Sequence, residues 1–142
     1  MNSDKQLKLV NIFLGLLITG EALALIIGMN INTDGNEWLT TANYTLLAID
    51  LVSGILIAAL SFKLEKKKYL AVLFFTLAVI VGSHIFRNID FVTNPENHFV
   101  FNVPLLIFNN VKLLGALYSI ALIFYRWMNW ERDKKTIIEE LE

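Results

Sequence analysis

The chain has 142 residues, of which 56% are hydrophobic and 18% charged, and its net charge is −1. This balance is wrong for a soluble domain of that length, and it offers no electrostatic footprint for nucleic acid. The absence of cysteine excludes disulfides, thiolate metal sites and thiol catalysis. Two histidines, His84 and His98, are too few for a multi-histidine metal site. The composition therefore indicates a single membrane domain, and it identifies no metal site and no cofactor.

Four apolar stretches have the length of a bilayer-crossing helix, given a rise of about 1.5 Å per residue and a hydrocarbon core of about 30 Å. They cover approximately residues 9–29, 44–62, 69–87 and 102–126. A cleaved signal peptide is an alternative for the first stretch, but its apolar run continues beyond the small-residue pattern at residues 22–24. Short connectors favour an antiparallel up-down-up-down arrangement. The predicted fold is an all-α integral membrane protein, a four-helix bundle forming one transmembrane domain.

The basic residues predict the orientation of this bundle. Of the 12 lysines and arginines, all but Arg87 and Lys112 fall on one side of the four-span topology. Because basic residues accumulate in cytoplasmic loops, we expect a multi-pass protein with both termini in the cytoplasm. Residues 127–142 then form a short cytoplasmic helical tail. This tail is interpreted either as a solvated extension of the fourth helix or as a docking segment for a partner.

Lys112 and the neighbouring Asn109 and Asn110 interrupt the fourth apolar stretch. A lysine at the centre of a transmembrane helix costs about 2.5–3.5 kcal/mol on translocon-based scales. Glu21 and Asp50 are each isolated within another apolar stretch, and either of them would offset this cost by pairing with the lysine. We therefore predict that a carboxylate on the first or second helix lies within hydrogen-bonding reach of Lys112, directly or through water.

Residue counting predicts that these polar groups lie at similar depths. Glu21 is roughly 18–20 Å above the inner boundary, while Asp50 and Lys112 are roughly 9–15 Å below the outer one. Helical spacing also gives each span one face that carries its polar residues. The prediction is a polar, charge-balanced chamber in the outer half of the bundle. Its predicted ligand-binding residues are Glu21, Asp50, His84, Asn109, Asn110 and Lys112, with Arg87 and Asp90 at the outer rim.

Some of these residues have more than one interpretation. His84 is either a hydrogen-bonded histidine near the outer surface or a proton-exchanging group for the carboxylates below it. Arg87 either extends to the outer interface or binds a ligand, and its spacing to Asp90 permits an i,i+3 pair. A bis-histidine haem is disfavoured because His98 falls in or just beyond an outer loop.

Three classes of function fit these features. The leading hypothesis is a non-enzymatic protein of the lipid bilayer that binds or passes a small ligand, ion or proton. The second is an accessory or assembly subunit of a larger membrane complex, and a homo-oligomer is also possible. The third is a small membrane enzyme acting on lipid, although no hydrolase or transferase motif is present and no catalytic residue can be named. A purely structural ion-pair network that fixes helix register competes with the leading hypothesis.

Overall fold

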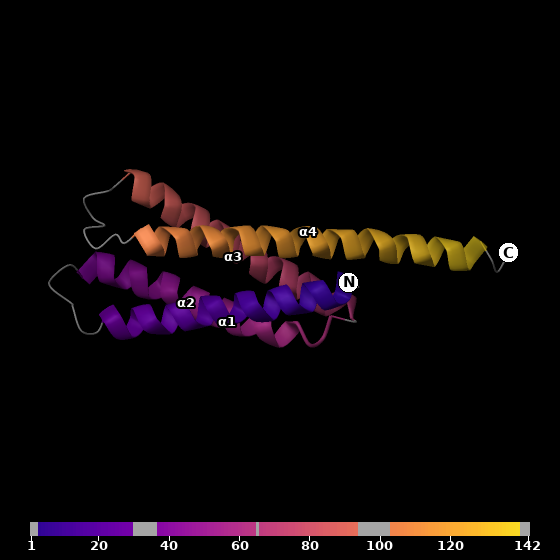
Figure 1. Ribbon diagram of the computed structural model, residues 1–142, viewed down its shortest axis with the longest axis horizontal. Helices are drawn as coiled ribbons and strands as arrows, with labels where there is room; N and C mark the ends of the chain where they lie inside the picture. The colour runs from indigo at the N-terminus through magenta and orange to yellow at the C-terminus, as the bar shows by residue number, and fades with distance from the viewer. Residues whose placement is uncertain (1–2, 30–36, 65, 94–102, 140–142) are drawn as a thin grey trace.

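The computed structural model describes residues 3–29, 37–64, 66–93 and 103–139, and the side chains of residues 4–27, 44–64, 66–89, 92–93 and 107–130. All elements in these ranges are helical. The helices are α1 (Ser3–Met29), α2 (Glu37–Leu60), α3 (Lys67–Thr93) and α4 (Val103–Glu139) (Figure 1). The longest, α4, has 37 residues and extends past the other three at its C-terminal end (Figure 1).

The prediction of four helices is confirmed, but the helices are longer than the apolar stretches that predicted them. Helix α1 already begins at Ser3, α3 continues to Thr93, and α4 continues through most of the predicted tail to Glu139. Hydropathy marks only the part of a helix that is suited to the hydrocarbon core. A helix continues beyond that part because its backbone hydrogen bonds are as well satisfied in the interface as in the core.

Three of the described helices are long and apolar enough to cross a membrane, which indicates a membrane protein. The qualifying stretches are Asp4–Ile27, Lys67–Ile89 and Ile107–Trp130. Helix α2 contains a shorter apolar stretch, Tyr44–Leu60, within its 24 residues.

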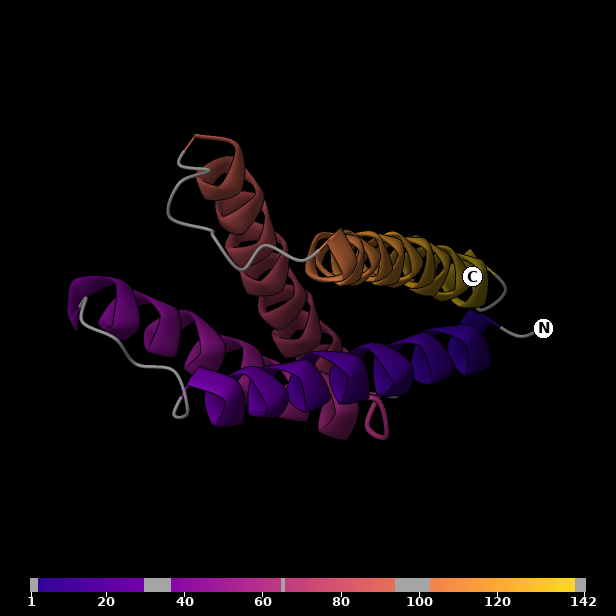
Figure 2. The ribbon, with the colours of Figure 1, turned by 60° about the vertical axis from the view of Figure 1, so that its left-hand side comes forward.

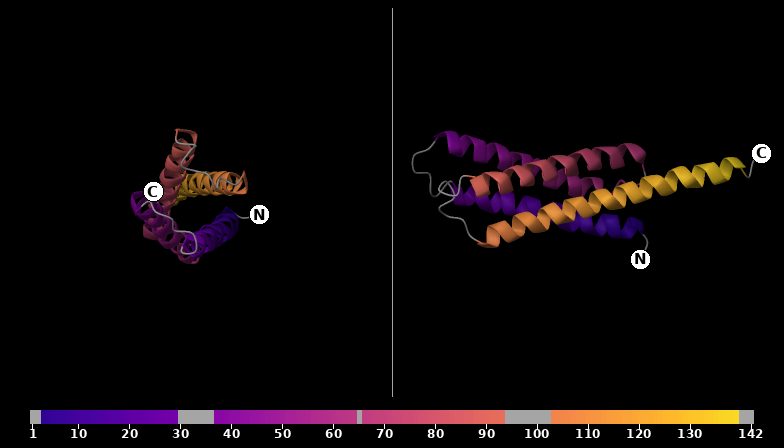
Figure 3. Two further views of the ribbon diagram at one scale, coloured as in Figure 1. Left: turned by 90° about the vertical axis from the view of Figure 1, so that its left-hand side faces the viewer. Right: turned by 90° about the horizontal axis from the view of Figure 1, so that it is seen from above.

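The helices pack as a ring that follows the order of the chain. Helix α1 contacts α2 and α4, and α3 contacts the same two helices, whereas the diagonal pairs α1–α3 and α2–α4 make no contact within the described residues. The end-on view in Figure 3 shows this arrangement, and Figure 2 shows that α3 is inclined to α1 and α2. Side chains that face the middle of the ring therefore come from all four helices.

The exterior of the bundle is apolar, unlike the surface of a soluble protein. Large apolar side chains cover the outside, as shown by Phe13, Phe75 and Leu114, which are each about two-thirds exposed. The interior holds an apolar core, which includes Leu14, Ile18 and Ile57, and also buried polar and charged residues: Asn11, Asp50, Ser53, Ser61, Thr76, His84, Asn109, Lys112 and Ser119. An apolar exterior suits lipid, and polar groups in a membrane protein are least costly when they face one another inside the bundle.

Helices α1 and α2 approach each other closely enough for their backbones to meet. A Cβ added at Gly15 would lie 2.6 Å from the carbonyl oxygen of Gly54 and 2.8 Å from the backbone nitrogen of Ala58. A Cβ added at Gly54 would in turn lie 2.9 Å from the carbonyl oxygen of Gly15. Gly54 and Ala58 are four residues apart, the small-xxx-small spacing that allows membrane helices to pack backbone to backbone. This contact fixes the position of α1 relative to α2.

One end of the bundle, which we call the basic end, is held by contacts of lysine and arginine side chains. Arg126 Nη1 on α4 lies 2.9 Å from Asp4 Oδ1 on α1. The ammonium of Lys8 lies 4.7 Å from the ring centroid of Phe62, which follows α2. The ammonium of Lys67 at the start of α3 lies 5.1 Å from the ring of Trp130. These contacts bring the start of α1, the end of α2, the start of α3 and the later part of α4 together.

Candidate functional site

Lys112 is ion-paired with Glu21 across the contact between α4 and α1. The pair joins Lys112 Nζ to Glu21 Oε2. The side chain of Lys112 is 1% exposed and that of Glu21 is 16% exposed, so the cation is the more deeply enclosed partner. This pair confirms the prediction that a carboxylate on the first or second helix lies within reach of Lys112. Uncompensated burial of the ammonium would be costly, and the carboxylate removes most of that cost.

The second carboxylate pairs with Arg87 on α3. Arg87 Nη1 lies 2.7 Å from Asp50 Oδ2, and the two side chains are 20% and 3% exposed. The sequence predicts Arg87 at the outer rim, with Asp90 as a potential partner. The structure instead gives Arg87 a partner on α2 that the sequence did not predict. Asp90 lies in α3, but its side chain is outside the described residues.

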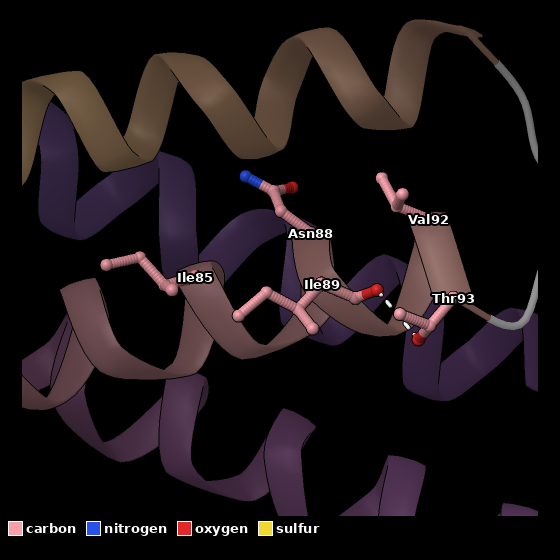
Figure 4. Close-up of a pocket in the computed structure, with 5 residues that line it drawn as sticks. All are labelled: Ile85, Asn88, Ile89, Val92 and Thr93. Atoms are coloured by element: carbon pink, nitrogen blue, oxygen red, sulfur yellow. Dashed lines mark hydrogen bonds between the residues drawn. The ribbon is translucent and has the colours of Figure 1, made fainter.

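An asparagine cluster joins α3 to α4 near these ion pairs. Asn109 Nδ2 donates to Asn88 Oδ1 at 2.7 Å, and Asn88 Nδ2 donates to Asn110 Oδ1 at 3.2 Å. One side-chain amide on α3 therefore holds two successive amides on α4. Figure 4 shows the Asn88 side chain directed toward α4. Asn88 is not among the predicted site residues, although it follows His84 by four residues and so lies on the same helical face.

The two ion pairs belong to one electrostatic cluster. Asp50 interacts with Lys112 and Glu21 as well as with Arg87. His84 is fully buried, and it lies within electrostatic range of both Lys112 and Arg87. We call this set the polar centre, and it consists of Glu21, Asp50, His84, Arg87, Asn88, Asn109, Asn110 and Lys112. Two carboxylates and two cations make the set charge-balanced when His84 is neutral.

Several buried atoms of the polar centre retain hydrogen-bonding capacity. Asp50 Oδ1 and Arg87 Nη2 have no hydrogen-bond partner among the described residues, although each side chain is ion-paired through another atom. Within the same residues, neither ring nitrogen of His84 makes a hydrogen bond of good geometry, while the ring lies near the Ile80 carbonyl. Buried polar groups are normally paired with protein or water. These buried atoms are therefore the part of the polar centre whose hydrogen bonding the described residues leave incomplete.

A shallow groove lies next to the asparagine cluster, near the C-terminal end of α3. It is lined by Ile85, Asn88, Ile89, Val92 and Thr93 (Figure 4). The hydroxyl of Thr93 donates to the Ile89 carbonyl at 2.9 Å, shown dashed in Figure 4. Three of the five lining side chains are exposed aliphatics. The groove is thus a mostly apolar surface feature and differs from the predicted polar chamber.

The predicted inward faces agree with the observed burial. Along α4, Asn109, Lys112, Ala116 and Ser119 follow one another at spacings of three, four and three, which predicts that they share one face, and all four are buried. Among the described residues, no group of three or more His, Cys, Asp or Glu side chains is arranged to hold a metal ion. His98 lies outside the described residues.

No protein-family model, curated protein or solved structure matches this chain.

Proposed function

We propose that the polar centre binds or passes a small polar ligand, ion or proton in the outer half of a four-span membrane bundle. The observation that carries this proposal is the unmet hydrogen-bonding capacity around the Asp50–Arg87 pair. An acceptor on Asp50, a donor on Arg87 and the imidazole of His84 supply complementary contacts for one small polar species. Charged groups inside a membrane bundle are also more often functional than structural.

The proposed topology is antiparallel, with α2 as the fourth span and both termini in the cytoplasm. Helix α2 has 24 residues, and it spans about 36 Å at about 1.5 Å per residue. Support for alternating directions comes from the contacts at the basic end, which join the start of α1 to the later part of α4 and the start of α3 to the same region. The lysines and Arg126 at that end favour a cytoplasmic location.

A purely structural network explains only part of the polar centre. Interhelical polar contacts in membranes contribute about 0.6 kcal/mol on average, and they are most favourable when fully paired. The asparagine cluster and the Lys112–Glu21 pair fit that role because they join α4 to its two neighbours. The Asp50–Arg87–His84 part does not, since it leaves several buried atoms without partners in the described chain.

The other two hypotheses have less support. An assembly subunit should turn some of its polar stripe toward lipid, whereas Asp50, Asn109 and Lys112 are all buried within this single chain. An enzyme acting on lipid would need a nucleophile or a metal constellation near the carboxylates. The described residues provide neither a metal cluster nor a nucleophilic cysteine.

The proposal is tested on the full chain reconstituted in lipid vesicles and nanodiscs. Proton, Na⁺, K⁺ and Cl⁻ fluxes are measured with ion-specific dyes, and thermal stability is measured with each ion present and as a function of pH. We expect at least one of these species to be passed or to change the stability of the protein, and Asp50→Asn to abolish that effect. Thr76→Val is the matched control because the Thr76 hydroxyl already donates to the Val72 carbonyl of its own helix. Absence of any effect in the folded wild type, or its persistence in Asp50→Asn, would overturn the proposal.

A further inference from the structure

Polar residues recur along α4 at intervals of seven. Lys112, Ser119 and Arg126 are separated by two helical turns each, so they lie on one face of the helix, about 10 Å apart along its axis. Lys112 and Arg126 both pair with acids on α1, namely Glu21 and Asp4. This face of α4 therefore follows the contact with α1, which we call the α1–α4 seam, from the polar centre to the basic end.

The packing of Leu14 on Gly115 shows which residue of α1 lies at the level of Ser119. A Cβ added at Gly115 would lie 3.2 Å from Leu14 Cδ1, so these two residues lie at the same level. Asn11 is about one turn from Leu14 toward the start of α1, and Ser119 is about one turn from Gly115 toward the basic end. Asn11 and Ser119 thus lie at a common level, between the Glu21–Lys112 pair and the basic end.

Asn11 and Ser119 are both fully buried, and their polar atoms are unsatisfied. Neither the amide atoms of Asn11 nor the Ser119 hydroxyl has a hydrogen-bond partner within the described part of the chain. Two other buried hydroxyls behave differently: Ser61 donates to the Ile57 carbonyl at 2.6 Å, and Thr76 donates to the Val72 carbonyl of its own helix at 2.9 Å. A buried amide and hydroxyl without protein partners are the groups that ordered water satisfies in membrane and soluble interiors alike.

We infer that water enters the α1–α4 seam at Asn11 and Ser119 and that the species passed by this protein is the proton. This inference rests on the proposed function, since the seam leads to the polar centre. In each transfer a water molecule accepts one proton and releases another, so that only O–H bonds form and break and one H⁺ moves along the seam. The Asp4–Arg126 pair lies at the cytoplasmic mouth of this path, and the Glu21–Lys112 pair lies at its other end, in the polar centre.

Leu14 separates the two polar levels of the seam. Its side chain is 3% exposed, and it packs over Gly115 between the Asn11–Ser119 level and the Glu21–Lys112 level. Two further apolar side chains also interrupt the water chain. Ile18 lies between Leu14 and Glu21 on α1, Ile123 lies between Ser119 and Arg126 on α4, and both are fully buried. We expect slow proton passage rather than an open pore, and we expect Leu14 to limit its rate.

The flux experiment uses full-length protein in vesicles that contain a pH-sensitive dye, with proton movement driven by a K⁺ diffusion potential. Ser119→Ala and Asn11→Leu should each lower the proton flux by at least about tenfold, a barrier increase of about 1.4 kcal/mol. Leu14→Ala should raise it. Ser61→Ala and Thr76→Val are matched controls that remove buried but satisfied hydroxyls, and they should leave the flux unchanged. An absent wild-type flux, equal effects of Ser61→Ala and Ser119→Ala, or no increase in a folded Leu14→Ala protein would each overturn the inference.

A second measurement detects water directly and does not depend on proton flux through a variant. Water-edited solid-state NMR of the wild-type protein in bilayers should show magnetisation transfer from water to the side-chain amide of Asn11, assigned by its loss in Asn11→Leu. A dry Asn11 amide would overturn the inference. If Asn11 is dry and no proton flux occurs, yet Na⁺, K⁺ or Cl⁻ is still passed in an Asp50-dependent way, the inference fails while the proposed function stands. If Asp50→Asn changes nothing, the proposed function itself fails.

Discussion

Lys112 and Glu21 are ion-paired across the α1–α4 seam, and the lysine is almost completely enclosed while the glutamate retains some exposure. The free-energy cost of removing one charge of this pair therefore depends on which charge is removed. Removing the carboxylate leaves an ammonium that is 1% exposed without its counter-ion, whereas removing the lysine leaves a carboxylate that is 16% exposed. The stability of α4 in the bundle depends on this pair being complete.

Breaking the pair from either side should destabilise the protein, and removing both charges should restore much of the loss. We expect Glu21→Gln to lower the free energy of unfolding by about 3–5 kcal/mol, the usual cost of an uncompensated buried charge. Lys112→Met should cost less, and Glu21→Gln/Lys112→Met should be more stable than Glu21→Gln. The measurement is SDS-induced unfolding in mixed micelles. Strictly additive effects of the two substitutions would show that the pair is not coupled.

In the Asp50–Arg87 pair, removing the base should destabilise the protein more than removing the acid, which is the reverse of the order expected for Glu21 and Lys112. Asp50 is 3% exposed, and the Arg87 side chain, in the C-terminal part of α3, is 20% exposed. Arg87→Met therefore leaves a buried unpaired carboxylate and should be the more destabilising change. After Asp50→Asn, the long arginine side chain can extend toward the interface. SDS unfolding of the two variants gives the order, and a larger loss in Asp50→Asn would contradict it.

The backbone contact between α1 and α2 makes Gly15 intolerant of a methyl group. A Cβ there would lie within 3 Å of two backbone atoms, which cannot move aside without separating the helices. We expect Gly15→Ala to cost about 1–3 kcal/mol, as overpacking typically does. Gly20→Ala on the same helix is the control, since nothing lies within 4 Å of its added Cβ, and it should be neutral or slightly stabilising. Equal stability of the two variants would refute the backbone contact.

The asparagine cluster should contribute modestly to the α3–α4 contact. Asn88→Leu removes two interhelical hydrogen bonds and leaves two asparagines of α4 without these partners. The expected loss is about 1–2 kcal/mol, because membrane hydrogen bonds average about 0.6 kcal/mol each with a maximum near 1.7. Thr76→Val, which removes only a bond within α3, should change stability by less. A neutral Asn88→Leu would mean that the cluster does not hold α4.

The sequence predicts the depth of the polar residues and the helix face on which they lie better than it predicts which residues pair with one another. Hydropathy locates the helices, and the spacing within α4 correctly predicts that Asn109, Lys112 and Ser119 face inward. Periodicity does not reveal which neighbouring helix a face meets. Lys112 had two candidate carboxylates at similar depths, and only the ring order of the helices assigns Glu21 to it.

Arg87 and Asn88 illustrate what sequence reasoning lacks. An arginine near the end of a span satisfies its charge equally well at the interface or against a carboxylate, so its partner depends on the rotation of α3. Asn88 follows it directly, yet the two side chains meet different helices, Arg87 reaching α2 and Asn88 reaching α4. The inclination of α3 within the ring decides both contacts, and no local pattern encodes it (Figure 2).

Charge is divided between the two halves of the chain. The acids of the polar centre are Glu21 on α1 and Asp50 on α2. The bases that neutralise them are Lys112 on α4 and Arg87 on α3. Each helical hairpin alone would carry two like charges into the bilayer without compensation. The halves are therefore obligate complements: when they are expressed as separate pieces, each should be short-lived alone, and co-expression should rescue both.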